Sequence, residues 1–91
     1  TAVVCVSDTM AIGMIRGLKI RGLRVPEDMA VVGFGNLAVA DMITPALTTV
    51  DQCMRNIGIK AVEILMKEFY TPGLPLENIL FEPQLIKRES A

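Results

Sequence analysis

The chain has no histidine and no tryptophan, and aromatic residues make up only 4% of its 91 residues. Histidine is the commonest general base and metal ligand, so its absence argues against most acid–base and metal chemistry. The two cysteines, Cys5 and Cys53, show no metal-binding spacing and no disulfide framework, which favours a cytoplasmic location. No apolar run reaches the roughly 18 residues of a membrane-spanning helix. We therefore expect no metal, no cofactor and no membrane contact.

The chain also lacks an excess of charge of either sign, because its formal net charge is −1. This excludes the strong positive field on which non-specific binding to nucleic acid depends. A local basic group occupies one stretch, formed by Arg16, Lys19, Arg21 and Arg24. It is either a solvated helix end, where cations suit the helix dipole, or a phosphate site; the lack of interleaved aromatic residues favours the helix end.

No catalytic constellation is recognisable, and we predict no catalytic residue and no enzyme activity. Ser7 and Asp8 are adjacent, so their side chains point apart at the end of a strand. Gly33 and Gly35 lack the lysine of a phosphate-binding loop and do not open a long helix. The carboxylates are scattered along the chain.

The residues that are present indicate an α/β fold. Hydrophobic residues make up 52% of the chain and are mostly aliphatic, which suits a parallel sheet flanked by helices. The predicted order is a buried strand at 2–6, a helix at 9–21, a strand at 29–34, a helical turn at 38–43, a strand at 47–50, a helix at 52–69 and an extended segment at 79–86. The first strand–helix–strand unit predicts a parallel crossover.

Local signals set the ends of these elements. Ser7 or Asp8 caps the first helix, and Gly22 ends it. Gly13 and Gly17 lower the helix propensity, so we expect a close neighbour there. In the second helix Glu63 and Lys67 have the spacing of an ion pair. Pro83 marks a sheet edge, a bulge or a crossing between sheets.

Two polar groups follow neighbouring strands and form the candidate binding site. Ser7 and Asp8 follow the first strand, and Phe34, Gly35 and Asn36 follow the second. The carboxyl ends of parallel strands share one edge, where small ligands bind. Hydroxyl, carboxylate, amide and an aromatic ring suit a polar small molecule such as a sugar. Three alternatives stay open: Asp8 only caps a helix, Asn36 only forms a turn, and Phe34 belongs to the core.

The same residues carry a family resemblance. The motifs are S-D-x-x-A-x-G at 7–13, G-L-R-V-P-E-D-M-A-V-V-G-F at 22–34, P-A-L-T-T-V-x-Q at 45–52, I-G-x-x-A-x-x-I-L at 57–65 and L-I-K-R-E-S at 85–90. Together they resemble the lactose-repressor/galactose-repressor (LacI/GalR) family of bacterial transcriptional regulators. The resemblance implies a fragment of a type I periplasmic-binding-protein-like sensor domain. In that family an N-terminal helix-turn-helix binds operator DNA, and a small-molecule effector binds between two lobes.

The resemblance also implies how the chain is divided. Residues 1–50 would belong to the C-terminal lobe, residues 51–82 to the N-terminal lobe, and residues 83–91 would return to the C-terminal lobe. Val50, Asp51 and Pro83 would form the hinge. We expect the chain to be a piece of a longer protein, because it opens directly on an apolar strand.

The candidate effector residues depart from the family pattern. The family has Asn-Asp where this chain has Ser7 and Asp8, and an aromatic followed by Asp-Asp where it has Phe34, Gly35 and Asn36. This version resembles the gluconate-type branch. Without an acid at the last two positions, a carboxylate-bearing effector would not be repelled. The resemblance therefore predicts a sugar or a sugar acid such as gluconate as effector, with its cation supplied from outside this chain.

The resemblance further implies a homodimer. The candidate interface residues are Ile12, Ile15, Val39, Met42 and Ile43, and the alternative is that they pack against their own helix. Two other functions are possible for such a sequence. A periplasmic sugar-binding transport protein would share the fold, and an enzyme fragment has no supporting residue.

Overall fold

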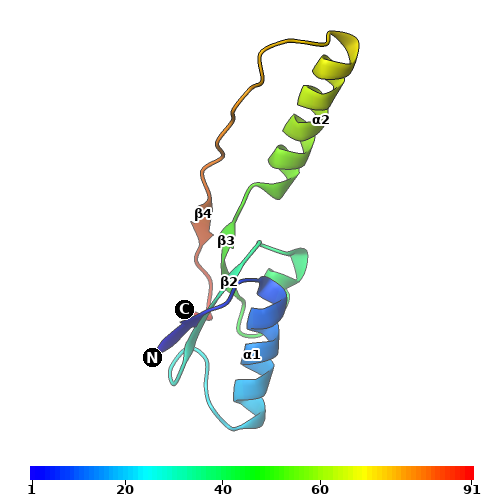
Figure 1. Cartoon of the computed structure of the whole chain (residues 1–91). Coiled ribbons are helices and arrows are strands. Elements are labelled where there is room, and N and C mark those ends of the chain that lie inside the picture. Colours follow the sequence, from blue (N-terminus) through cyan, green and yellow to red (C-terminus); the bar gives the residue numbers. More distant parts are fainter. The chain divides into compact units, whose positions relative to one another are not determined.

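The computed structural model describes all 91 residues, which form four strands, two α-helices and one short 3-10 helix. Figure 1 follows them in order. The elements are β1 (Ala2–Val4), α1 (Asp8–Ile20), β2 (Ala30–Phe34), the 3-10 helix η1 (Ala38–Asp41), β3 (Thr48–Asp51), α2 (Met54–Tyr70) and β4 (Gln84–Ile86). The chain divides into two compact units, residues 1–52 with 83–91 and residues 53–82, which we describe separately.

The first unit contains a four-stranded sheet in the order β1-β2-β3-β4. β1 pairs with β2 and β2 with β3 in parallel, whereas β4 pairs with β3 antiparallel. Helix α1 connects β1 to β2 and packs against β2 (Figure 1). The predicted α/β class and the parallel strand–helix–strand unit are confirmed.

Helix α1 begins and ends within one residue of the predicted bounds. Ser7 caps it, because its Oγ accepts a hydrogen bond from the backbone N–H of Met10 at 3.2 Å. Gly22 takes a φ of 74°, which only glycine adopts without strain, and closes the last turn. Asp8 is the first helical residue, so its carboxylate is not the cap.

The core of the first unit is a small aliphatic cluster. Its buried members are Cys5, Ala11, Ile15, Leu18, Val31, Ala40 and Leu47. They come from α1, β2, η1 and the segments beside the strands, so the core fills the space between α1 and the sheet. Burial raises the pKa of the Cys5 thiol.

Two predictions about packing are wrong within this chain. The strand at 2–6 was expected to be buried on both faces, but Val4 and Val6 are 73% and 79% exposed. β1 is the edge strand here, and α1 covers one face only. A β-carbon at Gly13 or Gly17 would meet nothing within 4 Å, so no close neighbour explains these glycines.

The second unit consists of α2 and a following segment without regular structure. None of the residues of α2 is buried. The predicted Glu63–Lys67 ion pair does not form: Lys67 Nζ lies 2.6 Å from Glu77 Oε1, and Glu63 pairs with Lys60 at 3.1 Å. These contacts raise the pKa of Lys60 and lower that of Glu77. Neither α1 nor α2 combines the length and the hydropathy that a membrane-spanning helix needs.

Candidate functional site

The carboxyl ends of β1, β2 and β3 bring the predicted polar residues together. Asp8 follows β1, Asn36 follows β2, and Asp51 ends β3. Hydrogen bonds link these three strand ends, as described below. We call this group, together with Arg88, the strand-end cluster.

Asp8 is the fully buried residue of the cluster, with 0% of its surface exposed. Its Oδ2 accepts a hydrogen bond from the backbone N–H of Leu37 at 2.6 Å, and its Oδ1 accepts one from Thr49 Oγ1. A buried carboxylate is tolerated when such bonds replace water. In this structure Asp8 therefore anchors the loop after β2 and the end of β3. Its role as an effector ligand stays a prediction.

Asn36 contacts side chains from two other segments. Its Nδ2 donates to Asp51 Oδ2 at 3.0 Å, and its Oδ1 accepts from an Nη of Arg88 at 2.9 Å. Its backbone N–H donates to Thr49 Oγ1 at 3.3 Å. The residue has a φ of 51°, a conformation that asparagine tolerates. It is thus a turn residue whose side chain also joins distant parts of the unit.

Arg88 was not predicted as part of this site. Its guanidinium donates to the carbonyl of Leu47 at 2.8 Å as well as to Asn36, and its backbone N–H donates to Thr48 Oγ1 at 2.8 Å. Arg88 therefore places a positive charge beside Asn36, while the expectation that the effector's cation comes from outside this chain stays a prediction. The only signal for Arg88 was its place in the motif at 85–90.

Phe34 and Gly35 form a more open side of the cluster. Phe34 is 37% exposed and does not belong to the core cluster. With Val4, Cys5 and Val6 it lines an apolar hollow of about 320 Å³. Gly35 has a φ of 126°, and a β-carbon there would find only Gln52 Nε2, at 4.0 Å. The Gly35 backbone and the Phe34 ring thus have open space beside them, whereas the Asn36 amide is bonded to Asp51 and Arg88 and the Oγ of Ser7 is engaged as the helix cap.

The predicted interface residues differ in exposure. Ile15 is only 3% exposed and packs in the core, so almost none of its surface is available to a second copy of the chain. Ile12 and Ile43 are half-buried against the core. Val39 and Met42 are 40% and 77% exposed and stay candidates.

The predicted hinge residues lie where the two compact units meet in sequence. Val50 pairs with Leu85, and Asp51 pairs with Gln84, in the β3–β4 ladder. The first unit ends after Gln52 and resumes at Pro83. That these residues act as a hinge stays a prediction.

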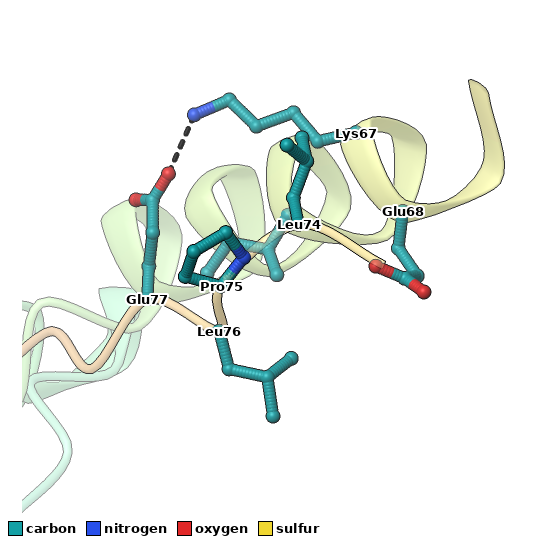
Figure 2. Close-up of a pocket in the computed structure, with 7 residues that line it drawn as sticks. Lys67, Glu68, Leu74, Pro75, Leu76 and Glu77 are labelled. Atoms are coloured by element: carbon teal, nitrogen blue, oxygen red, sulfur yellow. Dashed lines mark hydrogen bonds and ion pairs between the residues drawn. The ribbon is translucent and has the colours of Figure 1, made fainter. Parts of the chain in front are cut away.

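A second hollow, of about 420 Å³, lies within the unit formed by residues 53–82. Figure 2 shows it between α2 and the segment that follows. Its lining residues are Ile64, Lys67, Glu68, Leu74, Pro75, Leu76 and Glu77. Lys67 and Glu77 pair with each other, and the remaining lining is mostly apolar (Figure 2). Its charged lining residues are engaged within the unit, because Lys67 pairs with Glu77 and Glu68 Oε1 accepts a hydrogen bond from the N–H of Gly73, so nothing here indicates a ligand.

An α/β unit with polar side chains gathered at the carboxyl ends of parallel strands is a small-molecule-binding architecture. The whole chain, residues 1–91, matches the family described as "Periplasmic binding protein-like domain". The chain belongs to this family.

Beyond the family description, the chain can be compared with individual proteins. The chain is 38% identical over 90 residues to the "HTH-type transcriptional repressor PurR" of Vibrio cholerae, covering 99% of this chain and 27% of that protein. A LacI family transcriptional regulator from Enterococcus faecium with bound ribose superposes with a TM-score of 0.95 at 30% identity, over 99% of this chain and 34% of the other. A lac repressor dimer bound to operator and the anti-inducer ONPF gives a TM-score of 0.87 at 32% identity, over 99% of this chain and 31% of the other. The chain thus spans about a quarter of the length of the curated relatives it matches.

Proposed function

We propose that the chain is the effector-sensing and dimerising portion of a cytoplasmic, LacI-type bacterial transcriptional regulator that is not an enzyme. The observation that carries this proposal is the strand-end cluster, in which hydrogen bonds join Asp8, Asn36, Asp51 and Arg88 at the carboxyl ends of the parallel strands, next to Phe34 and Gly35. The similarity to repressors over 99% of the chain supports it. In this proposal the operator DNA is bound by a helix-turn-helix elsewhere in the full-length protein.

The mechanism we propose is a shift of population between two arrangements of two lobes. An effector changes DNA affinity only as far as it binds one arrangement better than the other. We propose that residues 1–50 and 83–91 belong to the C-terminal lobe and residues 51–82 to the N-terminal lobe. Val50, Asp51 and Pro83 would then absorb the backbone change between them.

We propose a sugar or a sugar acid such as gluconate as the effector. Positions 35 and 36 carry no acid, and Arg88 adds a positive charge next to Asn36. Asp51 supplies a negative charge on the other side of the same amide. The argument for an anionic effector therefore depends on two residues. Gly35 has open space beside its backbone, and Arg88 carries a positive charge that Asp51 partly offsets.

A thermal-shift screen of the full-length protein tests this proposal. The panel contains gluconate, ketogluconates, hexuronates, neutral hexoses, pentoses and purines. A ligand that binds only the folded state increases the free energy of unfolding, by about 2.7 kcal/mol when its concentration is a hundred times its Kd. The unfolding midpoint rises as a result. A rise with sugar acids alone supports the anionic effector. A rise with a neutral sugar or a purine contradicts it, and no rise with any compound contradicts the effector class itself.

A matched variant shows whether a responding compound binds on the open side of Gly35, next to the strand-end cluster. Gln52→Ala removes the amide that lies nearest to Gly35. Losing one hydrogen bond to a ligand costs about 0.5–1.5 kcal/mol, so we expect the Kd to rise roughly 2- to 10-fold. Gln84→Ala is the control, because Gln84 is an exposed residue of β4. Equal affinity in all three proteins would place the compound elsewhere.

A further inference from the structure

The Asn36 side chain occupies an unusual position, with a carboxylate on one side and a guanidinium on the other. Asp51, its acceptor, ends β3 one residue before the first unit ends at Gln52. Arg88, its donor, follows β4, on which the chain re-enters that unit. One amide therefore connects the loop after β2 with both segments by which the chain leaves and returns.

We propose that Asn36 is a positioning residue. It ties residues 34–36, which we call the effector loop, to Asp51 at the end of β3 and to Arg88 in the segment after β4. The hydrogen bonds of Asn36 that form this tie all lie within the first unit. Its role in signalling rests on the proposed function, because only that function makes residues 34–36 an effector loop.

The chemistry of an amide explains why this position suits asparagine. An amide donates through nitrogen and accepts through oxygen, whereas a carboxylate only accepts and a hydroxyl is too short to bridge in the same way. Both bonds of Asn36 involve an ionised partner, and such bonds are shorter and stronger than neutral ones. The three residues are partly buried, so water screens their charges less than at an open surface.

Backbone bonds make the same connection stiffer. The N–H of Gly35 donates to the carbonyl of Val50 at 2.8 Å, and the N–H of Asn36 donates to Thr49 Oγ1. A shift of residues 35–36 therefore displaces the partners on β3 unless these bonds break. Through Arg88 the same shift reaches the segment after β4.

Hydrogen exchange followed by mass spectrometry tests the tie in the full-length protein without any ligand. Asn36→Ala removes both side-chain bonds, and Asn36→Asp places a second carboxylate against Asp51. In both variants we expect amides in residues 47–52 and 84–90 to exchange on the order of tenfold faster, because local opening becomes easier. Asp41→Asn, an exposed change on η1, is the control and leaves these amides at the wild-type rate.

The double variant Asn36→Asp/Asp51→Asn makes the test independent of simple loss of folding. It exchanges the two groups, so the amide at position 51 donates to the carboxylate at position 36, which still accepts from Arg88. We expect exchange to return toward the wild-type rate. Wild-type exchange in both single variants, or a double variant as fast as Asn36→Asp, would overturn the tie.

A second arm with D-ribose and D-gluconate as probes tests signalling. Where a probe raises the unfolding midpoint, we expect it to slow exchange in residues 47–52 and 84–90 of the wild type. In Asn36→Ala the midpoint should still rise, but without that protection. Equal protection in both proteins would refute the signalling role. If neither probe raises the midpoint, the proposed effector class fails for these two sugars, and the ligand-free comparison alone decides the tie.

Discussion

At the scale of single residues, Gly33 supports the candidate site through the side chain it lacks. A β-carbon there would collide with Asp8 Oδ1 and would lie 2.9 Å from Leu47 Cδ2. Asp8 is held by two hydrogen bonds, so it does not move away easily. We expect Gly33→Ala to cost about 1–3 kcal/mol of stability through overpacking. Thermal unfolding of the full-length protein should show a lower midpoint, by a few degrees for each kcal/mol lost.

Gly17→Ala is the matched control for Gly33→Ala. It lies inside α1, and its β-carbon would meet nothing within 4 Å. Alanine is the better helix former by about 0.8–1 kcal/mol, so the midpoint should rise slightly. A fall for both variants, or for neither, would show that the crowding around Asp8 does not govern the effect.

Site residues were predictable one by one, but their partners were not. Phe34, Gly35 and Asn36 stand out because glycines and asparagine follow an apolar run. Arg88 lies 52 positions from Asn36 and reaches it through the antiparallel pairing of β3 and β4. Strand register is fixed by three-dimensional packing, so local pattern in one sequence does not show that contact.

At the scale of elements, apolar runs and periodicity predicted the order of helices and strands but not how deeply each is buried, and the extended segment expected at 79–86 is a strand only at Gln84–Ile86. The stripe of α1 was predicted from its 3.6-residue period, and Ala11, Ile15 and Leu18 are indeed buried. The similar stripe of α2 meets no covering element in this chain, and none of its residues is buried. The 3.6-residue spacing of apolar residues indicates which side of a helix is apolar. Only the tertiary structure shows whether another segment packs against that side.

The turn between α1 and β2 has a testable dependence on pH. The guanidinium and the backbone N–H of Arg24 both donate to the Asp28 carboxylate, and these bonds lower its pKa to about 2. The unfolded value is about 3.9, so this contact stabilises the fold above pH 4. The contribution is lost as the pH falls from about 4 through about 2.

We therefore expect Asp28→Asn to flatten the acid limb of the stability curve. Urea midpoints measured between pH 6 and pH 2 should converge for wild type and variant at the lowest pH and differ most at the highest. High salt should narrow the difference, because the pair is at the surface. Glu27→Gln is the control, since it removes the neighbouring carboxylate instead. Parallel curves for wild type and Asp28→Asn would contradict the assignment.

At the scale of the whole molecule, the alternation of strands and helices was enough to predict the α/β class. The mixed sheet was not fully predictable: Pro83 left an edge, a bulge or a crossing open, and the structure shows an antiparallel β4 beginning directly after it. The division into lobes came only from the family resemblance. Its assignment stays a proposal, although the compact units change over near the same residues.

Dimerisation is the prediction that belongs to this scale. In a two-fold symmetric dimer each interface residue meets the same surface of the second copy. Met42 is 77% exposed and lies next to the 40% exposed Val39, beyond the core that holds Ile15. Met42→Asp would bury an unpaired carboxylate at such an interface, which costs several kcal/mol, and each 1.4 kcal/mol is tenfold in Kd.

The measurement is the mass of the full-length protein by light scattering across micromolar concentrations. We expect Met42→Asp to have the monomer mass at concentrations where the wild type is a dimer. Ile20→Asp is the control, because Ile20 is 76% exposed as the last residue of α1, is not a candidate interface residue, and should leave the mass unchanged. If Met42→Asp keeps the dimer mass at low micromolar concentration, the interface does not include η1. If both variants dissociate, the added charge acts without regard to position, and the interface must be sought elsewhere on the unit.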